Sequence, residues 1–177
     1  SRTQGEIVDL TEQDLINLRR IIYLTIMSAA SFEEGSHKLA KLKIPAGYET
    51  ELANMLIECC ANEKSFQKHY GLMGQRLCMM RREYREAFCA TFAEQYATIH
   101  RLETNKLRNV AKFFSTLLHA DAIPWSCFSC IQLSETETTS SSRIFTKILM
   151  QELAEALGLM ELRDRLSNPE LLQDAYS

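Results

Sequence analysis

Apolar side chains recur along most of this chain at intervals of three and four residues, the spacing that places them on one face of an α-helix. The clearest stripe consists of Leu107, Val110, Ala111, Phe114, Leu117 and Leu118. A long helix before it carries the stripe Tyr84, Phe88, Phe92, Tyr96 and Ile99, and an early helix carries Leu15, Leu18, Ile22, Ile26 and Ala29. The pattern therefore predicts a succession of amphipathic helices.

Capping residues and helix breakers divide this pattern into about nine helices. Thr11 and Asp14 have capping-box spacing at the start of the first helix, and Ser31 and Glu34 have it at the second. Breakers fall at Pro45, Gly47, Pro124, Gly158 and Pro169. Further helices are expected at about residues 48–60, 66–80, 125–133, 143–157 and 160–166, with a restart after Pro169 and a polar connector over residues 134–142.

The order of these elements indicates an all-α fold. The links are short and no βαβ pattern is present, so helices that follow one another should pair as antiparallel hairpins. We expect one domain over residues 11–177, a HEAT-like stack whose repeats are structural and have no strict sequence period. Residues 1–10 are interpreted as a flexible extension or as a remnant of a larger protein, since the chain lacks a starting Met.

Composition narrows the classes of function. Hydrophobic residues make up 46% of the chain, which is enough for a continuous core, and the net charge of -3 argues against indiscriminate binding to nucleic acid. No uncharged apolar run reaches the roughly 18 residues of a membrane span. Catalytic motifs are also missing. The four histidines are dispersed, and Gly71–Gly74 is not followed by the Lys-Ser/Thr of a phosphate loop. We therefore expect no enzyme activity and no cofactor.

The six cysteines are the most reactive side chains in the sequence. They are Cys59, Cys60, Cys78, Cys89, Cys127 and Cys130. All lie among apolar neighbours at helical positions, so we interpret them as reduced thiols of an intracellular protein. Cys127 and Cys130 form a CxxC pair that could bind zinc or act in redox chemistry, but no second ligand pair lies nearby. Core packing is the favoured interpretation, and no metal site is expected.

Two polar regions are candidates for contacts with a partner. The first is a basic face of Arg101, Lys106, Arg108, Asn109 and Lys112, which would dock an acidic protein or the RNA backbone. The second is the segment Thr138, Thr139, Ser140, Ser141, Ser142 and Arg143, a candidate contact or phosphorylation loop. The alternatives are a solvated helix face for the first region and an N-cap for the second, and both stay open. The cluster Arg81, Arg82 and Arg85 has the same two interpretations.

Three segments of the sequence resemble one known family. They are LTEQDLINLRR at residues 10–20 followed by IYLTIMS at 22–28, IHRLETNKLRNVAK at 99–112, and TSSSRIF at 139–145. The first is similar to the opening of the MI domain, also written MA-3. The second and third are similar to signatures of that domain in the nucampholin family of splicing factors. The similarity runs from about residue 8 to residue 166 and supports the helical stack.

The resemblance also implies a function. It implies a nuclear scaffold domain of a pre-mRNA splicing factor, without catalytic activity. This domain would dock on spliceosomal core proteins and support splicing and exon junction complex assembly. In that family an upstream domain, absent from this chain, captures the helicase of the exon junction complex. Two alternatives stay open, which are direct binding to the RNA backbone and binding to a DEAD-box helicase by the MI domain itself.

Overall fold

The computed structural model describes residues 9–131 and 138–169, and it contains no β-strand in that part of the chain. Eight α-helices and two 3-10 helices are present there. They are α1 (Glu12–Met27), α2 (Phe32–Lys41), α3 (Glu49–Ala61), α4 (Lys68–Met80), α5 (Arg82–Ala97), η1 (Ile99–Arg101), α6 (Thr104–His119), η2 (Trp125–Cys130), α7 (Ser140–Leu157) and α8 (Leu159–Ser167). The expected extension over residues 1–10, the connector over 134–142 and the helix after Pro169 lie wholly or partly outside the described residues.

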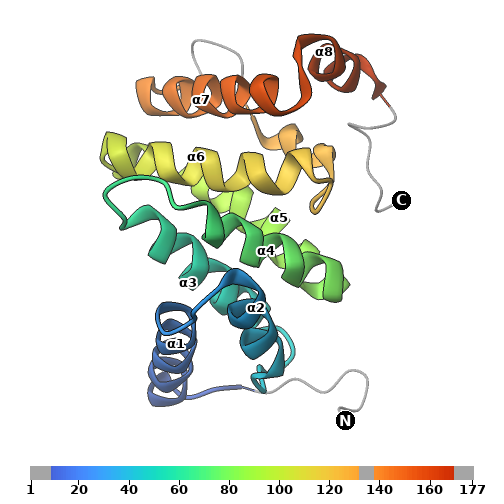
Figure 1. Ribbon diagram of the computed structural model, residues 1–177. Helices are drawn as coiled ribbons and strands as arrows, with labels where there is room; N and C mark the ends of the chain where they lie inside the picture. The colour runs from blue at the N-terminus through green and yellow to red at the C-terminus, as the bar shows by residue number, and fades with distance from the viewer. Residues whose placement is uncertain (1–8, 132–137, 170–177) are drawn as a thin grey trace.

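The helices are stacked in the order of the chain (Figure 1). The helices α1 and α2 form one end of the stack, and α7 and α8 form the other. Neighbouring layers contact one another, with α3 on α5, α2 on α4, and α6 on α3, α4 and α7. The structure thus confirms the predicted all-helical stack.

Helix α6 lies in the middle of the stack and is buried on more sides than its sequence stripe suggests. All six apolar residues of the predicted stripe are buried. Phe113, Ser115 and Thr116 are buried as well, because α3 and α4 cover one side of α6 while α7 covers another. A helix enclosed in this way leaves only a narrow edge for solvent.

The aromatic stripe of α5 anchors this middle layer. Tyr84, Phe88, Phe92 and Ile99 are buried as predicted, and Tyr96 is half-buried. The ring of Phe92 lies 5.0 Å from that of Phe114 in α6, 6.1 Å from Phe145 in α7 and 6.2 Å from Phe128 in η2, measured between centroids. Rings at these separations attract one another in addition to the area they bury. One side chain therefore connects four elements.

Glycine explains how α4 approaches α6 so closely. A Cβ atom at Gly71 would lie 2.8 Å from the Cβ of Thr116, and one at Gly74 would lie 3.1 Å from the ring of Phe113. The first distance is shorter than real carbon atoms tolerate. The motif excluded as a phosphate loop is thus a packing surface between helices.

Two predicted boundaries are wrong. Helix α7 begins at Ser140 and not at Arg143, because Thr139 is its N-cap and accepts a hydrogen bond from the Ser142 amide at 3.0 Å. The helix expected over residues 125–133 is the shorter 3-10 helix η2. There the Trp125 indole N–H donates to the Leu118 carbonyl at 2.9 Å, which satisfies an acceptor at the end of α6.

Candidate functional site

The predicted basic face is divided by the geometry of α6. Residues spaced by four lie on the same side of a helix, whereas residues spaced by two point about 200° apart. Arg108 and Lys112 accordingly share the narrow outer edge of α6, with Arg108 exposed and Lys112 half-buried. Lys106 is half-buried on a different side, and Arg101 is exposed on η1, just before α6. No ion pair with a described residue is present at any of these four cations.

Asn109 does not belong to an exposed face, which corrects the prediction. Its side chain is 1% exposed, and its Nδ2 atom lies 2.9 Å from the Glu63 carbonyl, 3.2 Å from that of Cys60 and 3.4 Å from that of Ala61. The last carbonyls of a helix have no partner within the helix. Asn109 therefore caps the C-terminal end of α3 from within the core and fixes α6 against it.

The Ser/Thr segment is organised around the start of α7. Ser142 is buried, and its Oγ accepts from the Thr139 amide at 2.9 Å while it donates to the Thr139 carbonyl at 3.0 Å. Thr139 and Ser142 thus form a capping box, in agreement with the N-cap alternative. Arg143 donates from Nη1 to the Thr138 hydroxyl at 2.8 Å, and Ser140 is exposed. Modification of this segment stays a prediction, and Ser142 is the member that the fold hides.

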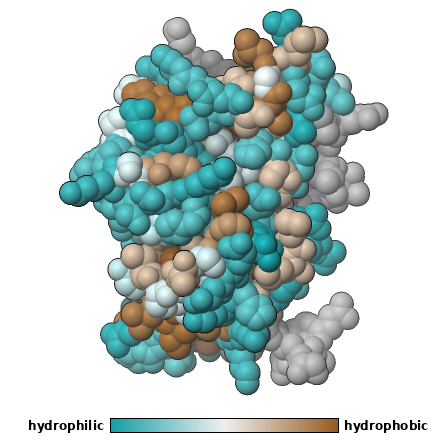
Figure 2. All heavy atoms as spheres, in the orientation of Figure 1, coloured by the Kyte–Doolittle hydropathy of each residue, from teal (hydrophilic) through white to brown (hydrophobic). Residues whose placement is uncertain are grey.

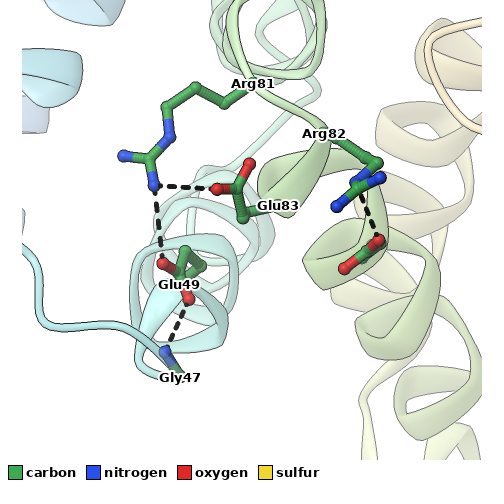
Figure 3. A network of polar contacts seen from close by, with 6 residues as sticks. Gly47, Glu49, Arg81, Arg82 and Glu83 are labelled. Carbon is green, nitrogen blue, oxygen red and sulfur yellow. Dashed lines mark hydrogen bonds and ion pairs between the residues drawn. The ribbon is translucent and has the colours of Figure 1, made fainter. Parts of the chain in front are cut away.

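Two arginines of the cluster at the α4–α5 junction, Arg81 and Arg82, pair with glutamates (Figure 3). Arg81 Nη2 lies 3.4 Å from Glu83 and 3.7 Å from Glu49, which in turn accepts from the Gly47 amide at 2.9 Å. Arg82 pairs with Glu86 at 3.4 Å, whereas Arg85 has no ion pair among the described residues. The network connects the start of α5 to the start of α3, and a docking role for the cluster stays a prediction.

The prediction that all six cysteines are reduced is wrong for one pair. Cys89 in α5 and Cys127 in η2 form a disulfide, and their Cα atoms are 5.9 Å apart. The two positions are 38 residues apart in sequence and meet only because η2 packs on α5, so local spacing could not reveal the pair. The CxxC pair is not a joint site, since Cys130 instead donates its thiol hydrogen to the Cys127 carbonyl at 3.3 Å.

The buried free thiols should react slowly. Burial raises the pKa of Cys60 and of Cys78 to about 12, and that of Cys59 to about 11. Because the thiolate is the nucleophile, we expect Cys60 and Cys78 to react with a thiol reagent at pH 8 about 1,000-fold more slowly in the native protein than in the unfolded protein. Mass spectrometry after timed alkylation measures these rates. Equal rates in the native and unfolded protein would contradict the burial of these thiols.

The outer face of α1 was missed by the sequence analysis. The predicted stripe of this helix includes Ile22 and Ile26, and these two residues are buried. The opposite side carries Ile16, Tyr23 and Leu24, which are all exposed. The signal was available in the sequence, because the second half of α1, IIYLTIM at residues 21–27, is apolar on nearly every side and so has a second surface to cover.

The described residues form no metal site and no membrane-spanning helix. They contain no group of three or more His, Cys, Asp or Glu side chains placed to hold a metal ion. In the same part of the chain, no helix combines the length and the apolar character needed to cross a membrane. Asp121, which lies near His119 in sequence, is paired with Arg165 at 2.8 Å. That arginine lies 5.1 Å above the ring of Trp125, so the pair fastens α8 to η2.

Comparison with known proteins places this geometry in a family. The model of the MA3 domain matches residues 18–124. The pre-mRNA-splicing factor CWC22 of Mycosarcoma maydis is 51% identical over 174 residues, which are 98% of this chain and 20% of that protein. The CWC22 homolog of Homo sapiens is 53% identical over 163 residues, or 92% of this chain and 18% of that protein. The splicing factor cwf22 of Schizosaccharomyces pombe is 50% identical over 167 residues, 94% of this chain and 19% of that protein.

These relatives agree with the resemblance noted in the sequence. The chain spans about a fifth of the length of the curated relatives that it matches. Within that part the similarity covers nearly all of the helical stack, and the MA3 domain of such splicing factors is non-catalytic. The family model alone extends over more than half of the residues. The chain therefore belongs to the MA3 domain family.

Proposed function

We propose that this domain is a docking module of a nuclear pre-mRNA splicing factor. In this role it binds core proteins of the spliceosome, and through them it supports splicing and the later assembly of the exon junction complex. The observation that carries the proposal is the identity of at least 50% to several pre-mRNA-splicing factors over 92–98% of the chain. The helical stack suits this role because its packed layers hold surface side chains in fixed relative positions.

The surface that we propose for docking is the basic edge, defined as Arg101, Arg108 and Lys112. Arg101 and Arg108 are exposed, and none of the three has an ion pair with a described residue, so their charges are free to meet carboxylates of a partner. Complementary charges of this kind steer association and set its orientation. Asn109 is not included because it is buried.

A protein partner fits the basic edge better than RNA does. Binding to a phosphate backbone gains its affinity from many cations that neutralise phosphates together. Here only Arg108 and Lys112 share the outer edge of α6, and the whole chain has a net charge of -3. An acidic patch on a folded protein requires fewer cations, provided that shape and apolar contacts add to the binding.

Charge reversal at the basic edge tests the proposal. We expect the triple variant Arg101→Glu, Arg108→Glu and Lys112→Glu to bind purified spliceosomal core proteins at least about tenfold more weakly, because attraction becomes repulsion. Its free energy of unfolding should change by less than about 0.5 kcal/mol per substitution, since these side chains lie at the surface. Pull-down with the full-length splicing factor and urea unfolding of the domain measure the two quantities.

A matched variant distinguishes an effect of the basic edge on binding from an effect of the total net charge. Lys41, Lys43 and Arg163 are also exposed cations, and they lie on or next to other helices of the stack. Their replacement by Glu changes the net charge equally and should leave binding unchanged. Equal losses for both variants would show that only the total charge matters. Loss of RNA binding, with protein binding intact, would instead favour the RNA alternative.

A further inference from the structure

Helix α1 exposes an unusual amount of apolar surface. Half of the exposed large hydrophobic residues in the described part of the chain lie on this helix, and each is between 46% and 56% exposed. They are Ile16, Ile21, Tyr23, Leu24 and Met27. In Figure 2 hydrophobic side chains gather at the lower end of the molecule, where Figure 1 places α1. A surface with several neighbouring apolar side chains is characteristic of a binding site.

The exposed residues follow the spacing of a helix–helix seam. Ile16, Arg20, Tyr23 and Met27 are separated by four, three and four residues, so they form a single row along α1, with Leu24 beside it. The opposite side of α1 already packs on α2 and α3 through Ile22 and Ile26. The helix therefore has one apolar side inside the fold and a second apolar side outside it, although Met27 at the end of the row also accepts a hydrogen bond at its sulfur from the Tyr70 hydroxyl of α4 at 3.7 Å.

The end of the stack is the wrong place for such a row unless something covers it. In proteins made of stacked helical units, the outer face of a terminal unit is usually polar, which keeps the protein soluble. Here α1 lies at the end of the stack of described helices (Figure 1), and its outer face exposes Ile16, Tyr23 and Leu24. A further helix that packs along the row would continue the stack with the same geometry as its inner layers.

Arg20 indicates which kind of residue the partner should carry at this position. This side chain is exposed in the middle of the row and has no ion pair among the described residues, whereas its neighbour Arg19 is bound to Glu51 at 2.6 Å. A purely apolar helix laid on the row would bury the Arg20 charge without compensation, which is strongly unfavourable. A carboxylate opposite Arg20 removes that penalty and fixes the register of the two helices.

We propose that the row Ile16, Arg20, Tyr23 and Met27 binds an amphipathic α-helix of a partner protein, with an Asp or Glu of that helix opposite Arg20. The partner helix has apolar residues spaced by three and four, and it packs on α1 as one more layer of the stack. This inference rests on the proposed function, in which the domain docks on proteins. It concerns a surface at the end of the stack that is separate from the basic edge on α6 and η1.

Site-specific cross-linking tests the seam in the full-length splicing factor within assembled spliceosomes. A photoreactive amino acid at Tyr23 should give cross-links that map to one helical segment of a partner with an acidic residue. Arg20→Glu should then lower the cross-link yield at least about tenfold, because two carboxylates would face each other. Reversal of the partner's acidic residue to Lys should restore the yield with Arg20→Glu, since the charge pair is re-formed.

Several outcomes would overturn the seam. Cross-links only to the chain itself, to a second copy, or to no protein would show that no partner helix binds the row. An unchanged yield with Arg20→Glu would show that no carboxylate lies opposite Arg20. The matched control is Arg163→Glu on α8, an exposed arginine that should not affect the cross-link. Binding of core proteins that depends on the basic edge, combined with no cross-link at α1, would reject the seam and leave the proposed function standing.

Discussion

Replacement of Asn109 by aspartate is expected to lower the free energy of unfolding by about 3–5 kcal/mol, because it places a charge in the core without a partner. The amide nitrogen of Asn109 faces the carbonyl oxygens of Cys60, Ala61 and Glu63 at 2.9–3.4 Å. The substitution exchanges this donor for an oxygen that can only accept, so attraction to three acceptors becomes repulsion. Urea unfolding followed by the fluorescence of Trp125, the single and buried tryptophan, measures the loss.

The pH dependence of the unfolding free energy of Asn109→Asp shows whether a buried carboxylate causes the loss of stability. Burial and the neighbouring carbonyls should raise the pKa of the new carboxyl in the folded state above its value in the unfolded chain. The folded state then binds the proton more tightly, so the loss of stability is full above the folded pKa and shrinks as the pH falls toward the unfolded value. A loss that does not depend on pH would argue against a buried carboxylate.

Asn105 provides a matched control on the same helix. It lies in the first turn of α6 and is exposed. Asn105→Asp makes the same chemical change where water solvates the charge and where the positive end of the helix dipole favours it. We expect no loss of stability from this variant. Comparable losses at both positions would show that Asn109 does not hold α3 and α6 together.

The helical stack could be predicted from the sequence because its determinants are local. Apolar stripes at helical spacing, the Thr11 cap and the stop at Gly158 each depend on residues within a few positions, and the structure confirms all of them. The number of neighbours around a helix is not local. The charged residues beside Asn109 predict an exposed position for it, whereas α3 covers that side of α6.

The distinction between local and non-local determinants also explains the other differences between the predictions and the structure. The N-cap alternative for the Ser/Thr segment was correct for Thr139 and Ser142, since capping is local, although the start of the helix was placed three residues too late. The Cys89–Cys127 pair depends on the packing of η2 against α5, which no spacing encodes. The outer face of α1 was visible in the sequence. One buried stripe already accounts for α1 as an amphipathic helix, so its remaining apolar residues do not alter the predicted fold.

Replacement of Phe114 by alanine should also cause a large loss of stability, because Phe114 connects α6 to the neighbouring layers of the stack. This side chain has no exposed surface, and its ring lies edge-on 5.0 Å from Phe92 and 5.4 Å from Phe113. Phe114→Ala removes the ring and leaves a cavity that surrounding helices cannot close without moving, so the free energy of unfolding should fall by about 3–5 kcal/mol. Thermal unfolding by circular dichroism and urea titration both measure this loss.

Phe66 allows a comparison of the same substitution outside the packed middle layer. It is only partly buried and lies before α4, where the chain can relax into the space that the ring leaves. Phe66→Ala should therefore cost clearly less than Phe114→Ala, because both the transfer of apolar area and the residual cavity are smaller. If the two variants lose the same stability, or if Phe114→Ala unfolds at the wild-type temperature, α6 does not hold the layers together in the way the ring contacts indicate.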